Sequence, residues 1–287
     1  MIHRIRTIDA HAAGEPLRLI VDGVPAPHGR TMLEKRDWLR EEQDHVRRAL
    51  MLEPRGHADM YGAIITEPVS PGSHAGVLFM HNEGYSTMCG HGLIAVTTIA
   101  LERGLLVPGG DGRTVVYDSP AGVVRAQARL RAGGAGGAGG TGGVGGAGGE
   151  VPRVESVAFL NVPSFVMHGG LLVRIGTRQV RADVAFGGAF YAIVDSEAVG
   201  LPLDAAHVPE LRRAGTEVKR TIESAYNIAH PLEPGLDGIY GTIFTGPPND
   251  PRADLRNVTE IKGTAWITGE HTFLLDDGDP LNEGFRI

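Results

Sequence analysis

A run of glycines near the middle of the chain constrains the fold more than any other feature. Residues 133–149 read GGAGGAGGTGGVGGAGG, with twelve glycines in seventeen positions. Such a segment has almost no apolar surface to bury and loses the most conformational entropy on ordering. We therefore expect a flexible surface linker between two lobes. A phosphate-binding loop is the alternative, but it needs a Lys-Ser/Thr pair or a helix start directly behind it, where Glu150-Val151-Pro152 stands.

Strand patterns dominate both sides of the glycine run. Apolar and polar residues alternate as in strands near 2–8, 17–21, 63–66, 76–79, 114–128, 157–162, 171–175, 180–185, 189–194, 238–245 and 264–275. Helical spacing predicts three helices, at 31–51, 92–103 and 211–226. The second of these is apolar nearly all round and ends at Gly104, so we expect it to be buried. Many strands with a helix in each half predict an α+β protein of two mostly antiparallel lobes.

These elements also divide the chain. We expect a first lobe over residues 1–130, a glycine-rich linker over 131–150 and a second lobe over 151–264. The last strand, within 265–287, is expected to return to the first lobe.

Charge and cysteine content narrow the function classes. A net charge of -7 argues against a protein that grips nucleic-acid phosphates, which needs a basic face. A mean hydropathy of -0.06 argues against a transmembrane protein. The single cysteine cannot form an internal disulfide, and the start MIHRIRTIDAHAAGE has no apolar signal region. We therefore expect a cytoplasmic protein that acts on a small molecule, with no nucleic-acid or membrane partner; a homodimer stays open.

The segment HNEGYSTMCGHGLIAV, residues 81–96, is the most informative stretch for chemistry. Cys89 falls where a turn meets the buried helix. There the backbone N–H groups of Gly90, His91 and Gly92 form an anion site, and the positive end of the helix dipole stabilises a thiolate. We therefore expect the pKa of Cys89 to lie below its ordinary value of about 8.5. A buried, inert cysteine is the alternative.

The histidines near this segment have two interpretations. His91 is either a base or partner for the thiolate, or a cap residue that contributes mainly its backbone amide. A metal site can be drawn from acidic and imidazole side chains, but none of their spacings is typical of a specific site, so we expect no metal. The residues concerned are His45, His57, Asp59, His81 and His91.

Six blocks of the sequence together resemble one family. They are DAHAAGEPLRLI, MLEPRGHADMYGA, HNEGYSTMCGHG, VAFGGAFYAIVD, IYGTIFTGPPNDPRADLRNVT and TAWITGEHTFLLDDGDPLNEGF. Interrupted only by the glycine run, they closely resemble the proline racemase family. HNEGYS and GGAFYA favour its trans-3-hydroxy-L-proline dehydratase branch over the epimerases.

The resemblance implies both a fold and a site. The implied fold is similar to that of diaminopimelate epimerase, with two pseudo-symmetric lobes, each a β-sheet around a central helix, and the substrate between the helix N-termini. By the same resemblance Cys89 takes the α-proton as general base. Gly90, His91 and Gly92 bind the substrate carboxylate through their amides, and no cofactor is implied.

One part of the family pattern is missing. After the block that ends in RNVT, members carry a second motif, Asp-Arg-Ser-Pro-Cys/Thr-Gly-x-Gly, which opens the second central helix. Here Thr259 runs directly into Glu260, so that segment looks deleted and only the helix at 211–226 is left for the second lobe. Each large apolar side chain lost from a core costs roughly 1.5–3 kcal/mol. A poorly folded or inactive remnant is therefore one expectation.

Elementary chemistry separates the reactions open to such a protein. Racemisation without a cofactor needs an acid and a base on opposite faces of the α-carbon, usually two thiols, and this chain has one. Dehydration of a 3-hydroxyproline needs only one base and a departing hydroxyl. We therefore expect a cofactor-independent dehydratase that converts trans-3-hydroxy-L-proline to 1-pyrroline-2-carboxylate. The alternatives are a 4-hydroxyproline epimerase or proline racemase-like protein, and an inactive remnant that only binds proline-like carboxylates.

Overall fold

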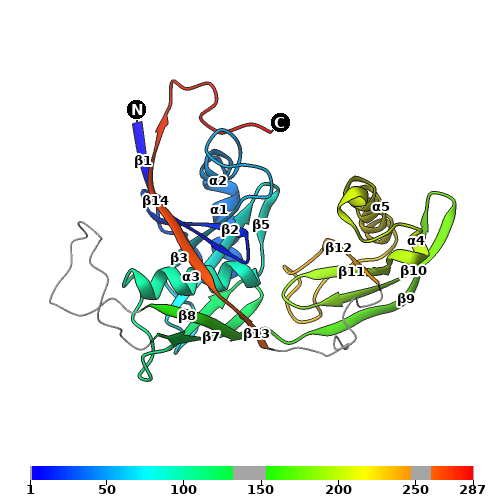
Figure 1. Cartoon of the computed structure of the whole chain (residues 1–287), viewed down its shortest axis with the longest axis horizontal. Coiled ribbons are helices and arrows are strands. Elements are labelled where there is room, and N and C mark those ends of the chain that lie inside the picture. Colours follow the sequence, from blue (N-terminus) through cyan, green and yellow to red (C-terminus); the bar gives the residue numbers. More distant parts are fainter. Residues whose placement is uncertain (1, 132–152, 247–259, 287) are drawn as a thin grey trace. The chain divides into compact units, whose positions relative to one another are not determined.

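The computed structural model describes residues 2–131, 153–246 and 260–286, so the glycine run and residues 247–259 of the block that ends in RNVT lie outside the described residues. The chain divides into two compact units (Figure 1). Unit 1 comprises Met1–Leu160 and Glu260–Ile287, and unit 2 comprises Asn161–Thr259. Both combine sheets with a few helices, which confirms the predicted α+β class.

Unit 1 is built on one sheet, in which the first and the last strand of the chain pair with each other. Its strands are β1 (Ile2–Ala12), β2 (Glu15–Asp22), β3 (Tyr61–Thr66), β4 (Ala75–His81), β5 (Gly84–Ser86), β6 (Thr114–Ser119), β7 (Gly122–Leu130), β8 (Val154–Leu160), β13 (Glu260–Gly263) and β14 (Ala265–Asp276). They pair in the order β13-β8-β7-β6-β4-β3-β2-β1-β14, and β5 pairs with β4. The β2–β3 and β4–β6 pairs are parallel. As Figure 1 shows, β14 runs beside β1.

Helix α3 (Gly90–Glu102) is the centre of unit 1. Every residue from Gly92 to Glu102 is buried, and the helix contacts strands from both ends of the sheet, including β1, β2, β7, β8 and β14. The sheet therefore curves around the helix, as the sequence predicts for the first lobe. The helix ends at Glu102, and Gly104 shortly after it has a φ of 63°, which glycine adopts without strain.

Two further helices pack against the sheet where the sequence predicts one. The helix expected over 31–51 is broken into α1 (Met32–Glu42) and α2 (Asp44–Met51), because Gln43 leaves the helical conformation with φ -130°. Their apolar side chains form a buried cluster with strand residues. The cluster includes Met32, Leu39, Val46, Leu50, Met51, Ile5, Ile64, Leu78, Met80 and Leu275.

Unit 2 is a four-stranded sheet with one long helix. Its elements are β9 (Phe165–Ile175), β10 (Arg178–Phe186), β11 (Phe190–Asp195), α4 (Ser196–Val199), the 3-10 helix η1 (Ala205–His207), α5 (Val208–Ala225) and β12 (Ile239–Thr245). The strand order is β12-β11-β10-β9, and β11 and β12 are parallel because α5 lies between them in the chain. Ala214, Val218 and Ile222 form the buried side of α5.

The two faces of the unit 2 sheet differ. Cross-strand pairs such as Ala182 with Val194 and Phe186 with Phe190 are buried on the face that α5 covers. The alternate residues lie on the opposite face. There Val166, Leu172 and Ile243 are 67%, 66% and 43% exposed. The second lobe thus keeps one covered face and one face with exposed apolar side chains.

The boundary between the units differs from the predicted lobes. Residues 154–160 and 260–263, expected in the second lobe, form β8 and β13 of the unit 1 sheet. The reason is strand pairing, because β8 pairs with β7 along its length and β13 pairs with β8. The linker predicted at 131–150 therefore joins two neighbouring strands of one sheet, and unit 2 is an insertion between β8 and β13.

Candidate functional site

Cys89 is the N-cap residue of α3, as its position in the sequence predicts. Its sulfur accepts a hydrogen bond from the Gly92 N–H at 3.4 Å, and the residue is 6% exposed. A Cβ atom at position 92 would lie 2.8 Å from the ring of Phe79 and 2.9 Å from the Cys89 sulfur. Glycine at 92 is therefore required for the close approach of the helix start to the sulfur.

His91 lies against the same sulfur. Its Nδ1 is 3.4 Å and its Nε2 3.7 Å from Cys89 Sγ. The Pro16 backbone raises the pKa of the His91 imidazole, in opposition to burial. The His91 and Tyr61 rings are in T-shaped contact, with ring centroids 5.0 Å apart and planes at 77°. The His91 side chain is thus part of the site and does not serve only as a helix cap.

Burial dominates the electrostatics of the pair. Burial raises the pKa of Cys89 to about 12, and the Gly92 N–H, which lowers that pKa, does not compensate. The pKa of His91 is lowered, mainly because burial disfavours the imidazolium. The expectation of a lowered thiol pKa was therefore wrong for this conformation, because the sequence marks the helix N-terminus but not the depth of burial.

The hairpin that precedes Cys89 is held by two arginines. Arg47 Nη1 donates to the carbonyls of His81 and Asn82 at 3.0 and 2.7 Å. Arg286 donates to the Asn82 carbonyl and to the Glu83 carboxylate, both at 2.6 Å. Burial, with Arg47 as the next cause, lowers the pKa of His81 to about 4, so this imidazole is neutral at pH 7.

The other histidines named from the sequence are not gathered into a metal site. Within the described ranges no group of three or more His, Cys, Asp or Glu could hold a metal ion. The Tyr61 ring contacts both His81 and His91. Tyr61 and Pro16 were missed by sequence reasoning, although both lie in blocks that carry the family resemblance, MLEPRGHADMYGA and DAHAAGEPLRLI.

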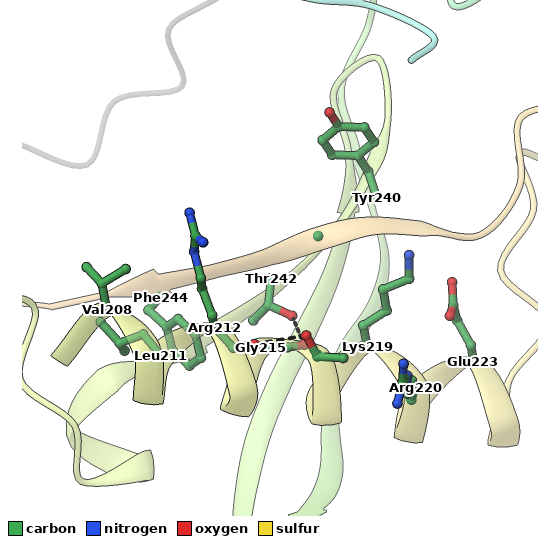
Figure 2. Close-up of a pocket in the computed structure, with 12 residues that line it drawn as sticks. Val208, Leu211, Arg212, Gly215, Lys219, Arg220, Glu223, Tyr240, Thr242 and Phe244 are labelled. Atoms are coloured by element: carbon green, nitrogen blue, oxygen red, sulfur yellow. Dashed lines mark hydrogen bonds between the residues drawn. The ribbon is translucent and has the colours of Figure 1, made fainter. Parts of the chain in front are cut away.

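A hollow of about 560 Å³ lies in unit 2 between α5 and β12 (Figure 2). Arg212, Lys219 and Glu223 project from α5 at its rim, and Thr242 Oγ1 donates to the Gly215 carbonyl within it. The lining contains neither cysteine nor histidine, and its one acid, Glu223, accepts the backbone N–H of Ile239. The hollow has no thiol or imidazole and its carboxylate is already engaged by a backbone N–H, so the Cys89 region is the candidate site. No helix in the described part of the chain is long and apolar enough to cross a membrane.

Comparisons with known proteins agree with these features. The family model described as proline racemase matches residues 7–262. The chain is 48% identical to the trans-3-hydroxy-L-proline dehydratase of Bacillus cereus, over 98% of this chain and 97% of that protein. It is 41% identical to a 3-hydroxyproline 2-epimerase of Burkholderia multivorans, over 88% of this chain and 70% of that protein.

Solved structures support the same fold. A probable proline racemase from Agrobacterium radiobacter K84 superposes with a TM-score of 0.83 at 24% identity, covering 99% of this chain and 96% of that one. A hydroxyproline epimerase from Agrobacterium vitis, with bound trans-4-hydroxy-L-proline, gives 0.83 at 23% identity, covering 99% and 95%. The alignment with the Bacillus cereus protein has 344 positions against 287 residues here, so at least 57 positions have no counterpart in this chain. The chain belongs to the proline racemase family.

Proposed function

We propose that the protein dehydrates trans-3-hydroxy-L-proline to 1-pyrroline-2-carboxylate. The observation that carries this proposal is a single thiol at the N-terminus of a buried helix, in a chain 48% identical to a protein named for this activity. The chemistry requires a base at one face of the α-carbon only, and no cofactor. A catalytic thiol also fits a reducing, cytoplasmic location.

In the proposed reaction, Gly90 and His91 bind the substrate carboxylate. As the first two residues of α3 they have N–H groups without an intrahelical acceptor, and the helix dipole favours an anion there. Gly92 supports the same anion site by holding the sulfur through its N–H. The carboxylate so placed brings its α-carbon to Cys89.

Cys89 then acts as the general base. A thiol with a pKa of about 12 is protonated at neutral pH, so its proton needs an acceptor. The neutral imidazole of His91, 3.4 Å away, is placed to receive it. The thiolate takes the α-proton, the C2–C3 double bond forms, and the C3 hydroxyl leaves as water with the proton that His91 received from Cys89. The resulting enamine takes a proton at C3, releases the proton on its ring nitrogen and becomes the cyclic imine.

The deciding experiment combines product detection with isotope labelling. Purified protein is incubated with trans-3-hydroxy-L-proline in D₂O, with Cys89→Ser as the matched control. We expect the imine to form with deuterium at C3, and only with the parent protein. Substrate recovered with deuterium at C2 and inverted configuration would instead identify an epimerase, the activity named for the Burkholderia multivorans relative. No imine above the Cys89→Ser level, from protein with an intact circular dichroism spectrum, would refute the dehydratase proposal.

A second candidate is a protein that only binds proline-like carboxylates. It is favoured by the missing segment of at least 57 positions and by the exposed apolar face of unit 2. This candidate predicts that calorimetry gives the same affinity for parent and Cys89→Ser, and that the α-proton of the bound acid does not exchange with solvent. Rapid exchange in the parent alone would exclude it.

A further inference from the structure

Tyr61 occupies a fixed place beside the candidate base. It is the first residue of β3 and lies opposite His81 of β4 in the sheet. The two rings are 5.2 Å apart between centroids and inclined by 31°. The Tyr61 ring also contacts the His91 ring in a T-shaped arrangement, with centroids 5.0 Å apart and planes at 77°. Tyr61 is therefore held by strand pairing and by His81, while it contacts His91.

The contacts of His91 explain why its orientation matters. A neutral imidazole has one N–H and one lone pair. The Pro16 carbonyl, which can only accept, raises the pKa of His91 and so favours an N–H on the ring. Both ring nitrogens lie within 3.7 Å of the Cys89 sulfur, so in either tautomer the nitrogen that carries the lone pair lies close to the thiol. A rotation of the ring about its side-chain bonds would break this arrangement.

We propose that Tyr61 is a positioning residue that holds the His91 imidazole where it can accept the Cys89 proton. Pro16 and Tyr61 restrain the ring from two different strands, β2 and β3, which pair in parallel. Aromatic edge contacts of this geometry are favourable beyond simple burial. The proposal rests on the proposed function for its catalytic meaning, but the Cys89–His91 coupling can be measured without any turnover.

The test is a double-mutant cycle read out on the thiol. Cys89 is the only cysteine, so iodoacetamide labelling followed by mass spectrometry reports on it alone. We expect Tyr61→Leu to slow labelling of the folded protein at pH 8 by about tenfold, within the range of coupled neighbouring side chains. Tyr61→Phe, which keeps the ring, should label at the parent rate. In a His91→Gln background, Tyr61→Leu should have no further effect.

Matched controls separate positioning from general loosening. Tyr85→Leu removes another half-buried tyrosine of unit 1, whose hydroxyl donates to the Leu39 carbonyl, and should leave the labelling rate unchanged. Tyr61→Met, of similar volume, replaces Tyr61→Leu if the latter fails to fold by circular dichroism. An unchanged rate in the folded leucine or methionine variant, or the same slowing in the His91→Gln background, overturns the proposal. If the cycle behaves as expected but no imine forms, the dehydratase assignment fails and the positioning role stands.

If turnover is found, kinetics give a further readout. Because Tyr61 acts on the base and not on the carboxylate site, Tyr61→Leu should lower kcat and leave KM close to the parent value. A rise in KM at constant kcat would place Tyr61 in substrate binding and overturn the positioning role.

Discussion

Native Cys89 should react slowly with iodoacetamide, and the expected slowing can be calculated. Burial raises the pKa of the thiol from 9.0 to about 12. At pH 8 this change lowers the thiolate fraction by roughly a thousandfold. A more basic thiolate is intrinsically more nucleophilic, which raises the labelling rate by roughly twentyfold. We therefore expect the folded protein to label about fifty times more slowly than the unfolded chain.

The assay compares initial labelling rates of the native protein with those in denaturant, from pH 7 to 9.5. With a pKa of about 12, the native rate should rise about tenfold per pH unit without a plateau. Pyrrole-2-carboxylate, a planar mimic of the α-carbanion, should slow native labelling further. A plateau with its midpoint at or below about 8.5 would refute the reasoning, because it would mean that the helix N-terminus outweighs burial.

Three further expectations concern the rest of the molecule. Asp118→Asn should cost about 1–3 kcal/mol of unfolding free energy at pH 7, since the buried carboxylate accepts two backbone N–H groups and one hydroxyl. Burial alone would raise the pKa of Asp118, but these hydrogen bonds lower it below 3.8. The stabilisation by the carboxylate is therefore present above pH 3.8 and is lost as the pH falls through the lowered pKa. Unfolding free energies of variant and parent from urea titrations should converge in that range. Replacing Leu172 and Ile243 by lysine should reduce ANS fluorescence and self-association, whereas the control Val107→Lys, at an isolated exposed site, should not. If the double variant gives the same signal as the control, the exposed apolar face of unit 2 does not bind ANS or drive association. Arg286→Ala should speed amide exchange in residues 82–85 while stability changes by less than about 1 kcal/mol. Equal exchange would show that Arg286 does not hold the hairpin and that Arg47 and the Asn82 side chain are sufficient.

Local signals in the sequence predicted the elements that depend on local physics. Alternation located most strands, and the apolar run ending at Gly104 located α3. The break at Gln43 could not be predicted, because glutamine is a good helix former. In the structure α1 and α2 make different tertiary contacts: Lys35 Nζ of α1 donates to the Glu67 carbonyl, and Arg47 of α2 reaches the hairpin before Cys89. Tertiary contacts therefore set the break.

The same distinction applies to the candidate site. The placement of Cys89 and His91 at the helix N-terminus follows from three consecutive positions of the chain. Tyr61 and Pro16 reach the site from β3 and the start of β2, and their approach depends on a parallel pairing that no local pattern encodes. Burial of the thiol likewise depends on the whole sheet around α3, so the direction of its pKa shift was not predictable. The catalytic roles stay predictions.

The pairing of the first strand with the last has a consequence for how the protein is made. β1 finds its partner β14 only after almost the whole chain has been synthesised, from Ile2 opposite Asp276 to Ala12 opposite Ala265. Unit 2 lies between these two strands in the sequence, so all of it is synthesised while one edge of β1 is still unpaired. The sheet of the N-terminal unit is therefore complete only after the inserted unit has been synthesised. The inserted unit can fold early, and the N-terminal unit closes last, so a premature stop anywhere before β14 would leave the N-terminal strand as an open edge for aggregation.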